Sequence, residues 1–361
     1  MGEKKGMRYT IKDKRELPAV DLVKFVCAIC VVYIHVPAFL SLSEEINYFI
    51  TLPCKIAVPF FFLASAYFLF EKINRCKDIN EEEKIMKSYC RKIGIIWLQW
   101  SGLYLICRIL DIIQRSGKDI LDIKILLYYI RELIQDFIFG GIGEHLWYLP
   151  ATLIGTFIVY KIRKNISEVF GFTIVIGLFL IGLLGNTYNF LLPESMQNIY
   201  NTIMSIILTT RNGIFWAPIF ILIGSYIADK GINTFQHNKQ VVILICSILG
   251  LILEGIWIFK NHENYTYLDL MISPVFLTTA LFLLLCHVEV RMSNMQAKRM
   301  RQMSLSIYLI HPMILYVCKW IAEVFGWKGL YQASGWYFIV VLTISVLLGY
   351  LMSTKRQKVA V

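Results

Sequence analysis

The sequence predicts an all-α protein, a polytopic transmembrane helical bundle of about ten spans with both termini in the cytoplasm. Composition is the first observation behind this prediction. Hydrophobic residues make up 57 % of the 361 residues and charged residues only 17 %, with a mean hydropathy of +0.60, values typical of membrane proteins. The second is that the apolar residues form long continuous runs without the alternation of β-barrel strands. The third is that Lys and Arg gather in alternate loops.

The apolar runs predict the positions of the spans, because a helix needs about 20 apolar residues to cross a ~30 Å hydrocarbon core. We expect spans at 18–40, 49–70, 93–111, 145–160, 169–185, 213–228, 241–259, 269–288, 303–322 and 335–352. Segment 125–139 differs, since charged residues recur in or beside it at helical spacing: Lys124, Arg131, Glu132 and Asp136. We therefore expect 125–139 to be a half-buried interfacial helix on the outer side.

The charge distribution predicts the orientation. The expected inner regions, 1–17, 71–92, 161–168, 229–239, 289–302 and 353–361, hold 25 of the 36 Lys and Arg residues, whereas the outer regions hold 7. This predicts a basic cytoplasmic N-terminus at 1–17, a transmembrane domain at 18–352 and a cytoplasmic tail at 353–361. The net charge of +11 then reflects orientation and contact with the lipid bilayer, and we expect no nucleic-acid partner. The nine cysteines lie mostly inside apolar runs, which predicts no disulfide framework.

Polar residues inside the spans are informative, because a charged group at mid-bilayer costs roughly 2.5–3.5 kcal/mol and must face protein or a wet cavity. In the first span, Asp21, Lys24 and His35 lie on one helical face. At 1.5 Å per residue, His35 is about 25 Å from the inner edge, while Asp21 and Lys24 are spaced to pair at the inner edge.

The other intramembrane polar residues fall into two predicted groups by depth. The inner group comprises Asp21, Lys24, Ser65, Tyr67, Arg91, Lys92, Ser304, Tyr308 and His311, and the outer group comprises His35, Lys55, His145, Tyr148, Arg211 and Glu254. Together they predict a cavity through the bundle with a basic cytoplasmic mouth. Plainer roles stay open: Arg91, Lys92 and Arg211 could be membrane anchors, His145 an interfacial residue, Glu254 a locally hydrogen-bonded group and His35 a structural histidine.

Six stretches, in order along the chain, resemble a known family. They are VDLVKFVCAICVVYIH at 20–35, VPFFFLASAYFLF at 58–70, the Arg91-Lys92 pair, HLWYLPATLIG at 145–155, TRNGIFWAPIFILIG at 210–224 and SLSIYLIHP at 304–312. On these residues the chain is similar to the acyltransferase-3 superfamily of ten-span bacterial membrane proteins. It departs from the family pattern at Lys24, where arginine is usual, at Ala66, where glycine is usual, and at Arg91-Lys92, where more arginines are usual.

The resemblance implies a multi-pass protein of the bacterial cytoplasmic membrane that moves an acyl group, expected to be acetyl, from cytoplasmic acyl-CoA to a hydroxyl of a cell-envelope acceptor. A hydroxyl is a poor nucleophile for a thioester, so a base is needed, and imidazole suits that task. We expect His35 to be this base, with His311 and Glu254 as further catalytic groups. The expected substrate-binding residues are Asp21, Lys24, Tyr67, Arg91, Lys92, His145, Tyr148, Arg211, Ser304 and Tyr308. No metal and no permanently bound cofactor are expected.

A second hypothesis follows from the TRNGIF and HLWYLPATLIG stretches, which are similar to the membrane half of the serine/alanine racemases of D-Ser-type vancomycin resistance. That resemblance implies a module for L-serine uptake, and we expect the racemase to be a separate polypeptide. In this case His35 and Glu254 would couple protons or bind an ammonium group, and Arg211 would bind a carboxylate. A third hypothesis is a membrane anchor for a partner enzyme. We favour acyl transfer.

Overall fold

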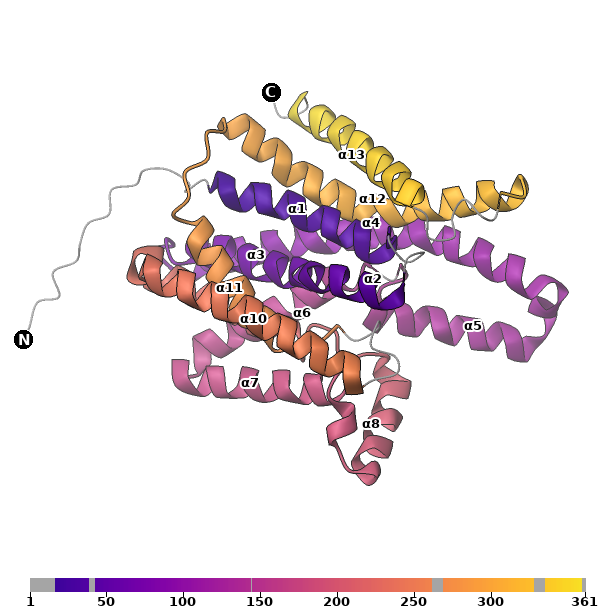
Figure 1. Ribbon diagram of the computed structural model, residues 1–361, viewed down its shortest axis with the longest axis horizontal. Helices are drawn as coiled ribbons and strands as arrows, with labels where there is room; N and C mark the ends of the chain where they lie inside the picture. The colour runs from indigo at the N-terminus through magenta and orange to yellow at the C-terminus, as the bar shows by residue number, and fades with distance from the viewer. Residues whose placement is uncertain (1–16, 39–42, 144, 262–268, 328–334, 359–361) are drawn as a thin grey trace, which may run out of the picture.

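The computed structural model describes residues 17–38, 43–143, 145–261, 269–327 and 335–358, and all regular secondary structure in these ranges is helical. The α-helices are α1 Pro18–His35, α2 Glu44–Thr51, α3 Ala57–Ile73, α4 Ile79–Ser116, α5 Ile123–Gln135, α6 Tyr148–Asn165, α7 Glu168–Leu184, α8 Glu194–Ile207, α9 Ala217–Lys230, α10 His237–Asn261, α11 Ser273–Leu285, α12 Asn294–Val324 and α13 Gly335–Lys358. Most of them run roughly side by side, whereas α8 lies across their common direction (Figure 1). The predicted all-α class is confirmed.

Helix length and composition support six of the ten predicted membrane spans. Each of the ten predicted spans contains a helix, but six stretches of the described chain are long and apolar enough to cross a membrane: Pro18–His35, Glu44–Ile73, Ile79–Ser116, His237–Asn261, Asn294–Val324 and Gly335–Thr354. Helices α6, α7, α9 and α11 fall outside this set. The count of ten and the cytoplasmic placement of the termini therefore stay predictions.

Helices α6, α9 and α11 each begin after an irregular segment inside the bundle. These segments are 145–147, 208–216 and 269–272, and they carry buried residues such as Leu146, Thr210 and Leu270. Pro218 and Pro274 stand in the first turns of α9 and α11, where proline costs no helical hydrogen bond. Irregular backbone at membrane depth is tolerated where protein surrounds it.

Two predicted inner loops, 71–92 and 289–302, are largely helical, which corrects the expectation. Helix α4 starts at Ile79, where the Asp78 carboxylate accepts a hydrogen bond from the Glu81 N–H at 2.8 Å. Helix α12 starts with a capping box between Ser293 and Gln296. Polar capping residues begin both helices in water, and the helices then continue into apolar sequence. At 1.5 Å per residue, the 38 residues of α4 span about 57 Å, more than a ~30 Å hydrocarbon core.

Helices α3 and α9 make a close contact at Gly224. A Cβ atom on Gly224 would lie 2.4 Å from the Leu63 carbonyl oxygen, so only glycine allows this approach. Small residues at helix contacts are the usual device of membrane bundles, because close packing replaces the hydrophobic driving force available in water. Helix α9 is thereby held directly against α3, which carries Phe61 and Ser65 of the site described below.

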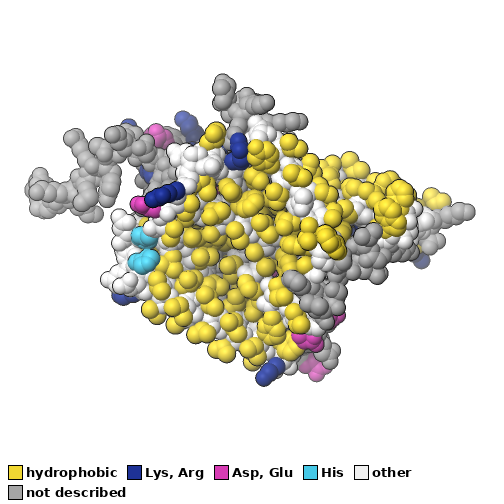
Figure 2. Space-filling model, turned by 45° about the horizontal axis from the view of Figure 1, so that its top comes forward, with side chains coloured by type: hydrophobic (Ala, Val, Ile, Leu, Met, Phe, Trp, Pro, Cys, Tyr) yellow, Lys and Arg dark blue, Asp and Glu magenta, His cyan; other side chains and the backbone are white. Residues whose placement is uncertain are grey.

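The surface is dominated by apolar side chains. Figure 2 shows a broad face of hydrophobic residues with charged and histidine side chains at its margins, as expected for a protein surrounded by lipid. Helix α5 confirms the helix predicted at 125–139: it has no buried residue and exposes Leu127, Ile130 and Ile134. Helix α8, which the sequence analysis missed, likewise exposes Ile199 and Ile203. The interfacial placement of α5 stays a prediction.

Candidate functional site

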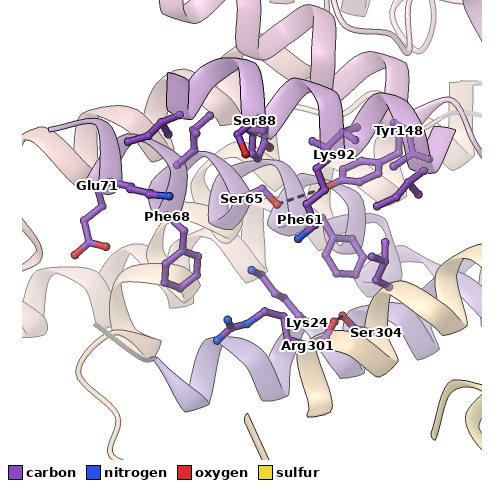
Figure 3. Close-up of a pocket in the computed structure, with 18 of the residues that line it drawn as sticks. Lys24, Phe61, Ser65, Phe68, Glu71, Ser88, Lys92, Tyr148, Arg301 and Ser304 are labelled. Atoms are coloured by element: carbon purple, nitrogen blue, oxygen red, sulfur yellow. Dashed lines mark hydrogen bonds between the residues drawn. The ribbon is translucent and has the colours of Figure 1, made fainter. Parts of the chain in front are cut away.

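A cavity of about 760 Å³ lies between α1, α3, α4, α6 and α12. Lys24 and Arg301 reach it from one side, and Lys92 reaches it from the opposite side (Figure 3). Five cations and one carboxylate line it: Lys24, Lys72, Arg75, Lys92, Arg301 and Glu71. Ser65, Tyr148 and Tyr308 line it as well, and a 3.5 Å hydrogen bond joins the hydroxyls of Ser65 and Tyr148.

The cations of this cavity are only partly neutralised. Arg75 pairs with Glu71 at 2.5 Å, and the ammonium of Lys24 lies 4.8 Å from the centre of the Phe68 ring. Among the residues that the structure describes, Lys72 and Lys92 have no carboxylate within ion-pair distance. A cavity with surplus positive charge suits an anionic ligand, and phosphate oxygens are strong acceptors for Lys and Arg.

Asp21 pairs with Arg301 and not with Lys24, which corrects the predicted pairing. The Asp21 side chain is fully buried, and the Arg301 guanidinium donates to both carboxylate oxygens at 2.9 and 2.5 Å. This bidentate geometry is available to arginine because its N–H groups form a planar fork. The sequence analysis missed Arg301 because it placed 289–302 in a loop. The signal was present, since Arg301, Ser304, Tyr308 and His311 follow at steps of 3, 4 and 3 along one helical face.

Three histidines from different elements meet next to Tyr308, which lines the cavity. The ring centre of His311 lies 5.2 Å from that of His35 and 5.4 Å from that of His145. The Tyr308 hydroxyl donates to the backbone carbonyl of His145, which ties α12 to the segment before α6. The sequence analysis placed His35 and His311 at different depths, and the structure brings them together. No set of His, Cys, Asp and Glu in the described chain is arranged to hold a metal ion.

The tautomer of His311 follows from its hydrogen bond. Its Nδ1 lies 3.0 Å from the Ile307 carbonyl oxygen. A carbonyl can only accept, so Nδ1 carries the proton and Nε2 carries the lone pair. This Nε2 is buried and has no hydrogen-bond partner among the described residues, and the same holds for Nε2 of His145. The arrangement therefore offers a buried imidazole nitrogen that can accept a proton from a ligand.

An ion cluster joins the three irregular segments that precede α6, α9 and α11. Asp269 pairs with Arg211 and, at 3.4 Å, with Lys55. The Arg211 guanidinium also lies 5.0 Å from the ring centre of Trp147. His35 is close enough to Asp269 to act on its carboxylate electrostatically. Arg211 is thus an internal ion-pair residue in this structure rather than a membrane anchor.

Three predicted site residues lie elsewhere than expected. Arg91 is exposed and does not line the cavity, whereas its neighbour Lys92 does. Tyr67 is buried and packs against the Phe282 ring at 5.1 Å, outside the cavity lining. Tyr148, which the sequence analysis assigned to the outer group, lines the cavity of the inner group. For Arg91 and Lys92 the difference arises because adjacent positions of a helix point in different directions.

Glu254 caps a helix in this structure. Its carboxylate accepts from the backbone N–H groups of Ile272 and Ser273 at 2.7 and 2.8 Å, and also from the Tyr188 hydroxyl. Burial raises the pKa of Tyr188, and the Glu254 carboxylate raises it further, so this hydroxyl stays protonated and donates. These contacts satisfy N–H groups at the start of α11. The sequence analysis left open that Glu254 is a locally hydrogen-bonded group rather than a catalytic one, and these contacts are such hydrogen bonds.

Comparisons with known proteins match the chain to proteins of two descriptions, an acyltransferase domain and amino-acid racemases. A family model described as an acyltransferase domain matches residues 17–354. An amino-acid racemase from Enterococcus faecalis is 27 % identical over 355 residues, which cover 96 % of this chain and 47 % of the relative. A serine/alanine racemase from Enterococcus gallinarum is 25 % identical over 346 residues, which cover 94 % of this chain and 46 % of the relative. A second Enterococcus faecalis amino-acid racemase is 31 % identical over 69 % of this chain and 34 % of its own length. The chain thus spans half or less of these relatives, and no solved structure matches it.

Proposed function

Since this chain belongs to the acyltransferase family whose model it matches over residues 17–354, we propose that it is an integral-membrane O-acyltransferase of the bacterial cytoplasmic membrane. It takes an acyl group, acetyl in the simplest case, from cytoplasmic acyl-CoA and transfers it to a hydroxyl of a cell-envelope acceptor. The observation that carries this proposal is the cationic cavity, one lining residue of which, Tyr308, packs against His145 and His311, whose Nε2 atoms are buried without a hydrogen-bond partner among the described residues.

The cavity chemistry fits a coenzyme A thioester. The phosphates of the donor would bind at the mouth, where Lys72 and Lys92 lack carboxylate partners and Lys24 and Arg301 lie close by. Aromatic and aliphatic side chains, among them Phe61 and Leu305, line the remainder and suit an apolar arm. A volume of about 760 Å³ lies within the range usual for small-molecule pockets.

The histidines would carry the proton transfer. As the acceptor oxygen bonds to the thioester carbonyl carbon, its proton passes to an imidazole, the C–S bond breaks, and the proton reaches the departing thiolate. We keep His35 as the proposed base and give His311 the partner role. His311 already presents an Nε2 lone pair beside His35, so the two rings can share the transferred proton. Buried groups exclude water, which would otherwise hydrolyse the thioester.

The test is transfer of label from [14C]acetyl-CoA to an alkali-labile ester in envelope fractions. Membranes carrying wild-type protein are compared with membranes carrying His35→Ala, His311→Gln and a control, His237→Ala. His237 is exposed at the start of α10 and its replacement should leave transfer unchanged. Loss of one acid–base group should lower transfer by about 10²-fold or more. Full transfer by His35→Ala at normal protein levels would refute its role as base, and no wild-type labelling above empty membranes would refute the function.

A second candidate function is uptake of L-serine or another small amino acid for a separate racemase in vancomycin resistance. Two observations favour it: the similarity to an amino-acid racemase and a serine/alanine racemase, and the three irregular segments joined through Trp147, Arg211 and Asp269. Transporters commonly bind substrates where interrupted helices begin inside the membrane. Accumulation of labelled L-serine in proteoliposomes tests it, with Arg211→Gln as the informative variant. Uptake no greater than in empty vesicles would reject this candidate.

A further inference from the structure

Helix α12 contains Pro312 directly after His311 and continues through it to Val324. Proline has no N–H, so the Tyr308 carbonyl cannot receive its helical hydrogen bond from residue 312, and the proline ring pushes the preceding turn away. A side chain or a water molecule often inserts into the hydrogen-bond ladder at such a break. The side chain that lies beside Pro312 is Tyr104, which comes from α4.

The Tyr104 hydroxyl bridges the two backbone groups that would form the next helical hydrogen bond. It donates to the Leu309 carbonyl at 2.7 Å and accepts from the Met313 N–H at 3.1 Å. Leu309 and Met313 stand two residues before and two residues after His311. Tyr104 is only 1 % exposed, so no bulk water competes for these bonds. The hydroxyl therefore fixes the backbone on both sides of the histidine.

The Tyr104 ring also touches the second buried histidine. Its centre lies 4.8 Å from that of His145, with the planes at 73°. Gly143 closes over both rings, since a Cβ atom there would lie 3.2 Å from Tyr104 Cγ and 3.1 Å from His145 Cε1. One tyrosine thus contacts the two chain segments that supply His311 and His145.

We propose that Tyr104 is a positioning residue whose hydroxyl fixes the backbone of α12 around Pro312 and so sets the direction of the His311 Nε2 lone pair. Only the consequence for turnover rests on the proposed acyl transfer, because the placement itself is a property of the fold. Lys92, twelve residues earlier on α4, lines the cavity mouth about 18 Å away along the helix.

The test is Tyr104→Phe, which keeps the ring and removes the hydroxyl. Protein labelled with 15N-histidine is examined by NMR in nanodiscs, and the His311 signal is assigned by its loss in His311→Gln. Wild type should show His311 in one Nδ1–H tautomer, and Tyr104→Phe should shift or split that signal. Turnover should fall about tenfold with the KM for the donor unchanged, the effect of losing ~1.4 kcal/mol in the transition state. The matched control is Tyr160→Phe, because the Tyr160 hydroxyl is buried without a hydrogen-bond partner in the described chain.

Pro312→Ala supplies the second variant. It restores the missing backbone N–H at residue 312, so the helical hydrogen bond to the Tyr308 carbonyl can form. The His311 signal should therefore move in the Pro312→Ala single variant. Adding Tyr104→Phe to this variant should then change turnover by less than twofold. An unchanged His311 signal in Tyr104→Phe overturns the proposal, as does a full tenfold effect in the Pro312→Ala background. If wild type transfers no acyl group, the proposed function fails, while the NMR signals still decide whether Tyr104 positions His311.

Discussion

The ion pair between Asp21 and Arg301 should be among the strongest single contacts between α1 and α12. Asp21 is fully buried and Arg301 is about one-third exposed to the cavity, with two hydrogen bonds between them. Breaking a buried pair typically costs 3–5 kcal/mol, and the exposure of Arg301 reduces this for Asp21→Ala to about 2–3 kcal/mol. With about 2 cal/mol/K of unfolding entropy per residue, Tm should drop by about 3–4 °C for 361 residues.

The assay is thermal unfolding in nanodiscs at a fixed scan rate, followed by a thiol-reactive dye. Cys27 and Cys286 are buried and react only when the bundle opens. Replacing both partners with alanine removes the stranded charge, so the double variant should cost less than the sum of the single variants by about 1.5 kcal/mol or more. The control is the exposed pair of Arg75 and Glu71, which should couple by less than ~1 kcal/mol. Additive effects at Asp21 and Arg301 would refute the reasoning.

Three further predictions concern one side chain each. Lys92→Ala should raise the KM for the acyl donor about fivefold by removing one phosphate contact, whereas Arg91→Ala, outside the cavity, should not; equal effects in steady-state kinetics would contradict the assignment. Gly224→Ala should lower the free energy of unfolding by about 1–3 kcal/mol because its new Cβ meets backbone, while Gly177→Ala, with nothing within 4 Å, should not. Glu254→Gln should lower stability by about 1–2 kcal/mol through weakened capping of α11 yet keep turnover per folded molecule; loss of turnover at unchanged Tm would restore it as a catalytic candidate.

The family of this protein is established, whereas its function is a proposal. The family is established by the match over residues 17–354, and six stretches in order along the chain, among them those around His35 and His311, suggested it from the sequence. The acyl donor, the acceptor and the racemase partner are proposals, because the relatives that match carry racemase names and are about twice as long as this chain.

Helical periodicity alone placed residues of one element on a common face. The face of the first span, with Asp21, Lys24 and His35, was predictable because a helix repeats every 3.6 residues whatever surrounds it. The same rule would have found Arg301 had α12 been extended to its capping box at Ser293. Local sequence also predicted that Glu254 might be satisfied by a hydrogen bond, but not which backbone groups would supply it.

Contacts between elements could not be predicted in this way. The meeting of His35, His145 and His311 depends on how α1 and α12 pack and on the irregular segment before α6. The partner of Asp21 was misassigned because an i, i+3 neighbour competes with residues 280 positions away, and sequence spacing carries no information about the distant ones.

The sequence by itself determined the all-helical class, the apolar runs that meet lipid and the polar residues that must avoid it. These follow from the cost of placing polar groups in hydrocarbon, which each segment meets independently. Only the tertiary structure decided which polar residues share the cavity and which imidazole nitrogens lack a hydrogen-bond partner among the described residues. It also decided that the Tyr104 hydroxyl bridges the backbone on the two sides of Pro312. These depend on distances of a few ångströms between helices, and such distances are fixed by packing of the whole bundle rather than by any one segment.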